Sequence, residues 1–427
     1  MIPDNVQIST LSNGLTFITI NQPWNQGIYC HAYVKVGSCD EQLVRDKGIC
    51  HFIEHMVFRG TENYTEEQIN KMITGRGGYF NGATSYSYTQ YDMWTQREYF
   101  GDTISILDNL VFKPIINSDI LNIEKEIIIE EAMEQKSDPF QQAILNNNKI
   151  LYPKHNFQYP IIGTTDSINN ITSTRIKEYL RGYYRPQTML LIICGNLPDQ
   201  NELEDILYTK AHGFVRKTRA SNSSAIQRKF GEFNSPPNDI YNKETWDDIK
   251  SSVSITSYVF NAKEIYKKDR VALQILTNII GGDSNSLMFK QIRNDGGLCY
   301  NCGAFSTILM DNLGSYSFAL FSRNTKIKQA EEKLDKILID ISKGKIQEDN
   351  ISEAKNSLVG NYMRGLESGS YFSRVLASCY LDDSGKYGIL PWEYSDIIKK
   401  TNKKHIVNLA QQILSNPKAR YVILNKE

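Results

Sequence analysis

Two histidines and a glutamate lie close together near the N-terminus, in the segment His51-Phe-Ile-Glu-His55. The segment has helical periodicity, so side chains at positions i and i+4 share one face and both imidazoles can reach a single metal ion. Glu54 lies on that face as well, where it can take a proton from a water at an open coordination position and later pass it to a leaving amine. This order of residues inverts the H-E-x-x-H motif of zinc peptidases. The spacing predicts a catalytic zinc site with Glu54 as the general base.

A catalytic zinc ion needs a third protein ligand, and no metal-binding motif surrounds the remaining histidines. The acidic segment 123–134 is the best source, because Glu124 and Glu131 are seven residues apart and fall on one face of a helix. An acidic helix face is often merely solvated. The pattern by itself therefore leaves Glu124, Glu130, Glu131 and Glu134 as alternatives.

Two other interpretations of the motif predict no catalysis. One is a helix that carries two solvated or capped histidines. The other is zinc as a structural staple, but structural sites commonly use four protein ligands rich in cysteine, and no cysteine pair flanks this motif.

The composition is that of a globular protein with no net charge. Lys+Arg and Asp+Glu both number 48, which gives no field to recruit nucleic acid or an anionic membrane. The N-terminus lacks the pattern of a signal peptide, and no apolar run is long enough to span a bilayer. The 7 cysteines are scattered through apolar segments, as expected of reduced core thiols. We expect a cytoplasmic protein that binds neither nucleic acid nor membrane.

The order of predicted elements repeats within the chain. In the first half we expect strands at 14–20, 28–36, 86–96 and 189–194, with helices starting near 48, 65, 98, 118 and 173. In the second half we expect strands at 252–260, 298–307, 314–321 and 420–424, and helices at 269–280, 326–342 and 348–366. The repeat indicates a duplication.

We therefore expect an α+β fold of two similar duplicated domains, each a mostly antiparallel sheet packed with helices. Residues 1–218 would form the zinc-binding catalytic domain, residues 219–245 a polar linker, and residues 246–427 the second homologous domain. No histidine occurs between His212 and His405, so the second domain should carry no metal and act as a substrate-side wall. This predicts one zinc ion per chain.

An ordered set of segments covers nearly the whole chain: His51 to Gly60, Gly77 to Thr84, Glu124 to Glu131, Ile162 to Thr164, Tyr184 to Pro186, and Arg293 with Tyr300. In these segments the chain resembles the pitrilysin or insulinase family of zinc peptidases. It is most similar to the half-length members related to mitochondrial processing peptidase and its bacterial homologues.

The resemblance assigns roles that the spacing leaves open. It implies that Glu131 is the third metal ligand and that Glu124 supports the site. It also implies that Arg293 and Tyr300, from the second domain, hydrogen-bond the substrate backbone or the tetrahedral intermediate. Without it, Arg293 would be an ordinary surface arginine and Tyr300 a core or interface residue.

The resemblance further implies that substrate adds as an extended strand to a sheet edge near Asn81, Ala83 and Thr84. The chain departs from the family at Gly82, where Ala is common. We expect this glycine to loosen the edge and to leave the metal site unaffected.

These features together predict a zinc metalloendopeptidase of the inverted-motif type that acts on unfolded peptides or leader segments. The resemblance implies that such a two-domain chain pairs with another, so that Arg293 and Tyr300 of one chain act at the zinc of the other. We expect either a homodimer or a heterodimer with a homologous sister chain. A non-catalytic structural member of the family is the rival hypothesis, and the intact zinc motif argues against it.

Overall fold

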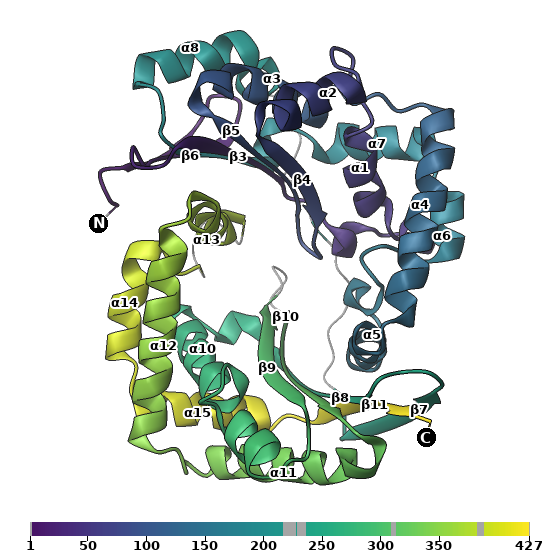
Figure 1. Cartoon of the computed structure of the whole chain (residues 1–427), viewed down its shortest axis with the longest axis vertical. Helices are drawn as coiled ribbons and strands as arrows, with labels where there is room; N and C mark the ends of the chain where they lie inside the picture. Colours follow the sequence, from purple (N-terminus) through teal and green to yellow (C-terminus); the bar gives the residue numbers. More distant parts are fainter. Residues whose placement is uncertain (1, 217–227, 229–235, 309–312, 382–387, 427) are drawn as a thin grey trace. The chain divides into compact units, whose positions relative to one another are not determined.

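The structure is a computed structural model that describes residues 2–216, 228, 236–308, 313–381 and 388–426 (Figure 1). The chain forms two compact units, and neither is continuous in sequence. Unit 1 comprises Met1–Ala132, Pro160–Phe230 and Gly365–Trp392, and unit 2 comprises Met133–Tyr159, Gly231–Arg364 and Glu393–Glu427. None of the described helices is long and apolar enough to cross a membrane.

Unit 1 is built on a six-stranded sheet with the order β1-β2-β6-β3-β5-β4. The strands are β1 (Val6–Thr10), β2 (Thr16–Asn21), β3 (Gly27–Val34), β4 (Tyr79–Thr84), β5 (Thr89–Gln96) and β6 (Met189–Gly195). Neighbours are antiparallel except β2 and β6, which are parallel. Strand β6 is buried along its whole length, as its continuous apolar sequence requires.

Helices cover both faces of this sheet (Figure 1). They are α1 (Ile49–Val57), α2 (Glu66–Ile73), α3 (Phe100–Phe112), most of α4 (Ser118–Ser137), α6 (Thr165–Asn170), α7 (Ser173–Tyr183), α8 (Gln200–Lys210), α9 (His212–Val215) and α13 (Gly369–Leu381). Alternate β3 residues Cys30, Ala32 and Val34 enter the main core with residues of α1 and α3. Helix α13 packs on the opposite face, where Gly369 lies against the β3 residue Tyr29.

Unit 2 is built on a five-stranded sheet with the order β7-β11-β8-β10-β9. Its strands are β7 (Ile240–Trp246), β8 (Ser252–Asn261), β9 (Asn301–Ile308), β10 (Leu313–Ser322) and β11 (Lys418–Asn425). Its helices are α5 (Pro139–Leu151), α10 (Lys267–Gly281), α11 (Asn324–Ser342), α12 (Glu348–Leu366), α14 (Pro391–Lys400) and α15 (Lys403–Leu414). The parallel pair β7 and β11 corresponds to β2 and β6, and every other neighbouring pair is antiparallel. Five strands of each sheet thus share one topology, with β1 as an additional edge strand in unit 1, which confirms two similar α+β domains.

Each half of the sequence gives one helix to the other half's sheet. Helix α5 follows the strands of unit 1 in sequence, yet its residue Ala143 is buried against Val253, Ile255 and Ile423 of unit 2. Helix α13 follows the strands of unit 2 and packs on the sheet of unit 1. Local periodicity cannot reveal such an exchange, because it shows that a helix has an apolar face and not which sheet covers it.

The predicted elements correspond closely to the observed ones, with differences at the ends and in the expected linker. Strand β5 begins at Thr89, whereas we predicted a start at residue 86, and β1, α5, α6, α8, α9 and α13–α15 were not predicted as elements. Strand β4 was expected only as the sheet edge that the resemblance implies. Within the expected linker, 219–227 and 229–235 lie outside the described residues. Its last part is not a linker, because Ile240–Trp246 forms β7, which gains a full ladder of hydrogen bonds by pairing with β11.

Two glycines bring the start of α1 into backbone contact with the Ile162-Gly163 segment. Gly48 precedes α1 with φ +90°, and Gly163 has φ +87°. A Cβ on Gly163 would lie 2.4 Å from the carbonyl oxygen of Lys47, and one on Gly48 would lie 2.3 Å from that of Ile162. The Ser167 hydroxyl also donates to the Lys47 carbonyl oxygen, at 2.7 Å. Only glycine fits at either position.

We predict that Gly163→Ala lowers the free energy of unfolding by about 2–4 kcal/mol, because a side chain there combines left-handed strain with overpacking. Urea unfolding followed by circular dichroism measures this. Gly182→Ala is the matched control, since its Cβ would meet nothing within 4 Å. An equal effect of the two substitutions would contradict the close contact.

Candidate metal centre

Helix α1 presents a polar face because its other faces are buried in the core. Phe52, Ile53 and Met56 are at most 1% exposed and belong to the main core of unit 1. His51 and His55 point away from that core, with side chains that are 12% and 23% exposed. The apolar positions of the nine-residue helix therefore fix the direction of both imidazoles.

The structure brings Glu131 of α4 to both histidines. Its Oε2 atom lies 3.7 Å from His51 Nε2 and 3.6 Å from His55 Nε2. Donors around one tetrahedral zinc ion, with bonds of about 2.0–2.1 Å, are separated by roughly 3.3–3.4 Å. Two imidazole nitrogens and one carboxylate oxygen are a donor set typical of catalytic zinc, in which the fourth position stays open. The residues fit the metal.

Among the described residues, His51, His55 and Glu131 are the one group of three or more metal donors that lie close enough to share an ion. Glu130 and Glu134, the alternatives that the sequence left open, are exposed. Helix α10, which occupies the place of α1 in the topology of unit 2, contains no histidine.

The two imidazoles have different electrostatic surroundings. Burial, together with the neighbouring His55, lowers the pKa of His51 to about 3, so this ring is neutral and available as a ligand. Burial alone would lower the pKa of His55 too, but the hydrogen bond with Glu124 and the charges of Glu54, Glu124 and Glu131 raise it. The His55 Nδ1 atom lies 3.1 Å from Glu124 Oε2, which directs Nε2 toward Glu131.

Glu124 supports this arrangement from a fully buried position. Its side chain is 1% exposed and contacts His55 through one oxygen and the Arg59 Nε–H through the other. Burial raises the pKa of Glu124, but these two partners outweigh burial and hold the pKa below its usual value. Arg59 also donates to Glu66 at 3.1 Å. A charged carboxylate is therefore kept behind the His55 ring.

Glu54 lies on the same face and is held by strand β4. Thr84 donates its hydroxyl hydrogen to Glu54 Oε2 at 3.1 Å. Burial raises the pKa of Glu54, and the charge of Glu131 adds to that, against the opposing effects of His55 and Thr84. A carboxylate with a raised pKa is suited to accept and return a proton.

We expected Gly82 to leave the metal site unaffected, and its nearest contacts are with Glu54 and Phe58 and not with a residue of the metal-donor group. A Cβ at this position would lie 2.7 Å from Glu54 Oε1 and 2.9 Å from the Phe58 ring. Gly82 and Thr84 share one face of β4 because residues alternate along a strand, and that face meets α1. The contact could not be recognised from local periodicity, because 28 residues separate Glu54 from Gly82 in the sequence.

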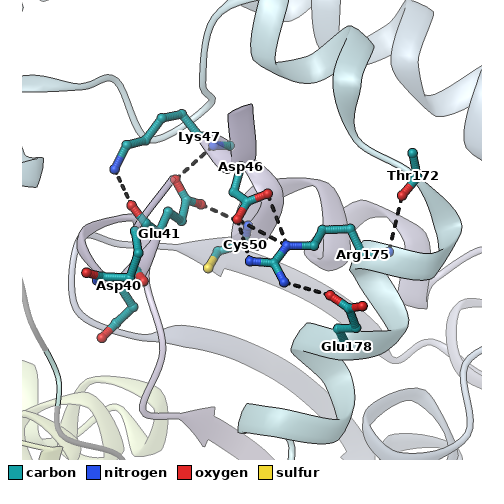
Figure 2. A network of polar contacts seen from close by, with 10 residues as sticks. Asp40, Glu41, Asp46, Lys47, Cys50, Thr172, Arg175 and Glu178 are labelled. Carbon is teal, nitrogen blue, oxygen red and sulfur yellow. Dashed lines mark hydrogen bonds and ion pairs between the residues drawn. The ribbon is translucent and has the colours of Figure 1, made fainter. Parts of the chain in front are cut away.

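A buried polar network fixes the start of α1 (Figure 2). Gly48 has no side chain to cap the helix, and the Glu41 carboxylate accepts the N–H groups of Gly48 at 2.8 Å and Cys50 at 3.0 Å instead. Lys47 donates to the Glu41 carbonyl oxygen. Burial raises the pKa of Glu41 to about 8, although the two N–H groups and Lys47 oppose that rise.

The same network joins the loop before α1 to helix α7 (Figure 2). Arg175 of α7 donates to both carboxylate oxygens of Asp46, at 3.1 Å from Nε and 2.6 Å from a terminal nitrogen. Arg175 also donates to Glu178 at 2.6 Å. Asp46 is buried, so this bidentate pair anchors the loop to the helix.

The remaining site residues lie at a strand edge and in unit 2. Asn81 and Ala83 are exposed on β4, the edge strand of its sheet. In unit 2, the Arg293 guanidinium lies 4.4 Å from the centre of the Phe289 ring. Tyr300 is 58% exposed, and its hydroxyl accepts a hydrogen bond from Ser251 at 3.3 Å.

Sequence reasoning missed two groups that support the site. Arg59 lies four residues after His55, so helical periodicity places both on one side of the chain. This spacing could have indicated that Arg59 reaches Glu124, the partner of His55. Glu41 could not have been found in this way, because it lies in a loop and caps a helix that begins eight residues later.

Known families match both halves of the chain. A family model described as "Insulinase (Peptidase family M16)" matches residues 16–165, and one described as "Peptidase M16 inactive domain" matches residues 170–358. The chain belongs to the M16 (insulinase) family of peptidases. The second description agrees with a unit 2 whose described residues contain no comparable metal-donor group.

Individual proteins resemble the chain along nearly its whole length. An "uncharacterized zinc protease" of Rickettsia felis is 26% identical and aligns over 97% of this chain and 96% of its own length. The "uncharacterized zinc protease YmxG" of Bacillus subtilis is 23% identical over 94% of this chain and 92% of its own. The crystal structure of a protease from Helicobacter pylori superposes with a TM-score of 0.87 at 19% identity, covering 98% of this chain and 99% of that one.

Substituting Gly82 should disturb the proton-transfer group. We predict that Gly82→Ala lowers kcat for peptide hydrolysis by about tenfold to a hundredfold, because the new methyl group displaces the Glu54 carboxylate and a misplacement of about 1 Å can cost about a hundredfold in rate. Zinc content, measured by atomic absorption, should stay unchanged. Gly75→Ala is the control, since its Cβ would meet nothing nearer than 3.8 Å. Full activity of Gly82→Ala would contradict the contact with Glu54.

Neutralising Glu124 should weaken metal binding. We predict that Glu124→Gln lowers zinc affinity by about tenfold to a hundredfold, as is typical when the partner of a ligating histidine is changed. Competition with a chromogenic chelator measures the affinity. Glu126→Gln, an exposed position on the same helix, is the matched control. Equal affinities of the two variants would rule out a supporting role for Glu124.

Proposed function

We propose that the chain is a zinc metalloendopeptidase that hydrolyses peptide bonds of unfolded peptides or leader segments. The observation that supports this best is the convergence of His51, His55 and Glu131, with the Glu54 carboxylate on the same helix face. These groups would hold a metal ion through three protein ligands, with a proton-transfer group beside it.

His51, His55 and Glu131 would hold one zinc ion per chain, and Glu124 would keep His55 in the ligating tautomer. When bound, zinc acts as a Lewis acid that activates water and polarises a carbonyl group.

The chain's own residues would handle the protons. Glu54 would accept a proton from the attacking water and then give it to the amine that leaves. The hydrogen bond from Thr84 orients the Glu54 carboxylate without preventing protonation of its other oxygen. The raised pKa of Glu54 favours the protonated state that the second step requires.

Strand β4 offers a way to hold an extended peptide. It lies at the edge of the sheet, and Asn81 and Ala83 on it are exposed. A peptide that pairs with the free side of β4 would be bound through its main chain, which tolerates varied side chains. Since the hydroxyl of Thr84 on the same strand contacts Glu54, such a peptide would lie beside the proton-transfer group.

We propose that the working form is a dimer, either of two identical chains or with a homologous sister chain. Arg293 and Tyr300 of the second unit would then contact the substrate backbone, and their exposure leaves them available to do so. We also propose that the protein is located in the cytoplasm.

The sharpest test is Glu54→Gln in the purified protein. We predict that hydrolysis of an unfolded peptide falls by about a hundredfold to ten-thousandfold, the range of general acid–base catalysis, while zinc stays bound. Glu134→Gln, an exposed glutamate on α4, is the control and should stay active. Unchanged hydrolysis by Glu54→Gln with zinc retained would overturn the mechanism. Activity of the wild-type protein only after mixing with a second protein would establish the heterodimer.

A further inference from the structure

A cavity of about 370 Å³ lies in unit 1 and is lined by none of the residues of the metal centre. Its walls come from the end of α3, from the Tyr184-Arg-Pro186 segment before β6, and from α9 with the residue after it. Phe112, Tyr184 and Pro186 provide apolar surface. The volume is in the range of small-molecule sites in proteins.

Four basic side chains line this cavity: Lys113, Arg185, His212 and Arg216. Within the part of the chain that the structure describes, no aspartate or glutamate lines it. Among the described residues, none of the four basic side chains forms an ion pair or a side-chain hydrogen bond, and the buried Nε–H of Arg185 has no acceptor. Basic side chains that share one cavity without a carboxylate among them are favoured by an anion that lies between them.

Arg185 lacks a carboxylate partner, unlike the other half-buried arginines of unit 1. Within the described part of that unit, each of the others meets a carboxylate: Arg59 meets Glu124, Arg76 meets Asp102, Arg175 meets Asp46, and Arg228 meets Asp40. Arg185 is the exception, and it points to the cavity where three more basic groups gather.

A buried acidic group that interacts with two of the basic residues does not neutralise the cavity. Asp108 is buried behind its wall, where Oδ1 accepts the Phe214 N–H at 2.9 Å. Burial raises the pKa of Asp108 to about 6, partly offset by the N–H groups of Phe214 and Gly213 and by Lys113 and His212. Even with Asp108 ionised, three permanently basic side chains leave an excess of positive charge.

We propose that this cavity binds the phosphoryl group of a small phosphorylated molecule. The planar fork of an arginine matches the oxygens of a phosphate, and Lys113 and Arg216 would add charge from other sides. Phe112, Tyr184 and Pro186 would cover an organic group attached to the phosphate. The proposal is independent of the peptidase function, because the cavity and the metal centre share no lining residue.

Isothermal titration calorimetry of the full-length protein tests this with phenyl phosphate and inorganic phosphate as probes. We expect saturable binding that weakens as sodium chloride is raised. In Arg185→Gln, affinity should fall by at least about tenfold, the usual effect of losing a charged hydrogen bond. Arg181→Gln is the matched control, since Arg181 is exposed on α7 and does not line the cavity, and it should bind as the wild type does.

The two probes separate the sources of the phosphoryl group. Tighter binding of phenyl phosphate would assign the site to phosphorylated organic molecules, and equal binding would assign it to inorganic phosphate. Absence of saturable binding, or equal affinity in Arg185→Gln and the wild type, would overturn the proposal. If circular dichroism shows that Arg185→Gln does not fold, Lys113→Gln is read by the same criteria.

Discussion

The metal centre depends on helix α1 keeping its apolar face buried and its first turn capped. Residues such as Phe52 and Met56 fill the face of α1 that contacts the core. Their close packing prevents the helix from rotating about its axis. At its start, Glu41 replaces the side-chain cap that Gly48 cannot supply, and the Gly48–Gly163 contact brings two backbones together. The positions of both histidines depend on these constraints, since a small rotation of the helix would separate their ring nitrogens from Glu131.

The charges around this helix are arranged so that neighbouring groups play different parts. Burial keeps His51 neutral, whereas the carboxylate of Glu124 orients and polarises His55. Glu124 is kept charged by His55 and Arg59, while burial raises the pKa of Glu54, which lies one turn along the helix face from His51. Groups close in space thus differ in proton affinity because each has its own set of partners.

The two units have similar folds but differ in the residues that could bind a metal ion. Five strands of each sheet have the same topology, but α10, in the place of α1, contains apolar residues such as Val271 and Leu276 and no histidine. The exchange of α5 and α13 means that each sheet is completed by a helix from the other half of the sequence. Neither half can therefore bury its own sheet fully without the other.

The sequence by itself determined what depends on short-range spacing. Two histidines at i and i+4 with Glu54 between them, the glutamates seven residues apart, and the repeated order of strands and helices were all readable, because a regular helix or strand repeats over a few residues. The tertiary structure decided what depends on segments far apart. It brings Glu131, and neither Glu130 nor Glu134, to the histidines, and it packs Gly82 against Glu54. It also assembles the basic cavity from residues 112, 185 and 216, which no local period connects, because only the packing of elements brings them together.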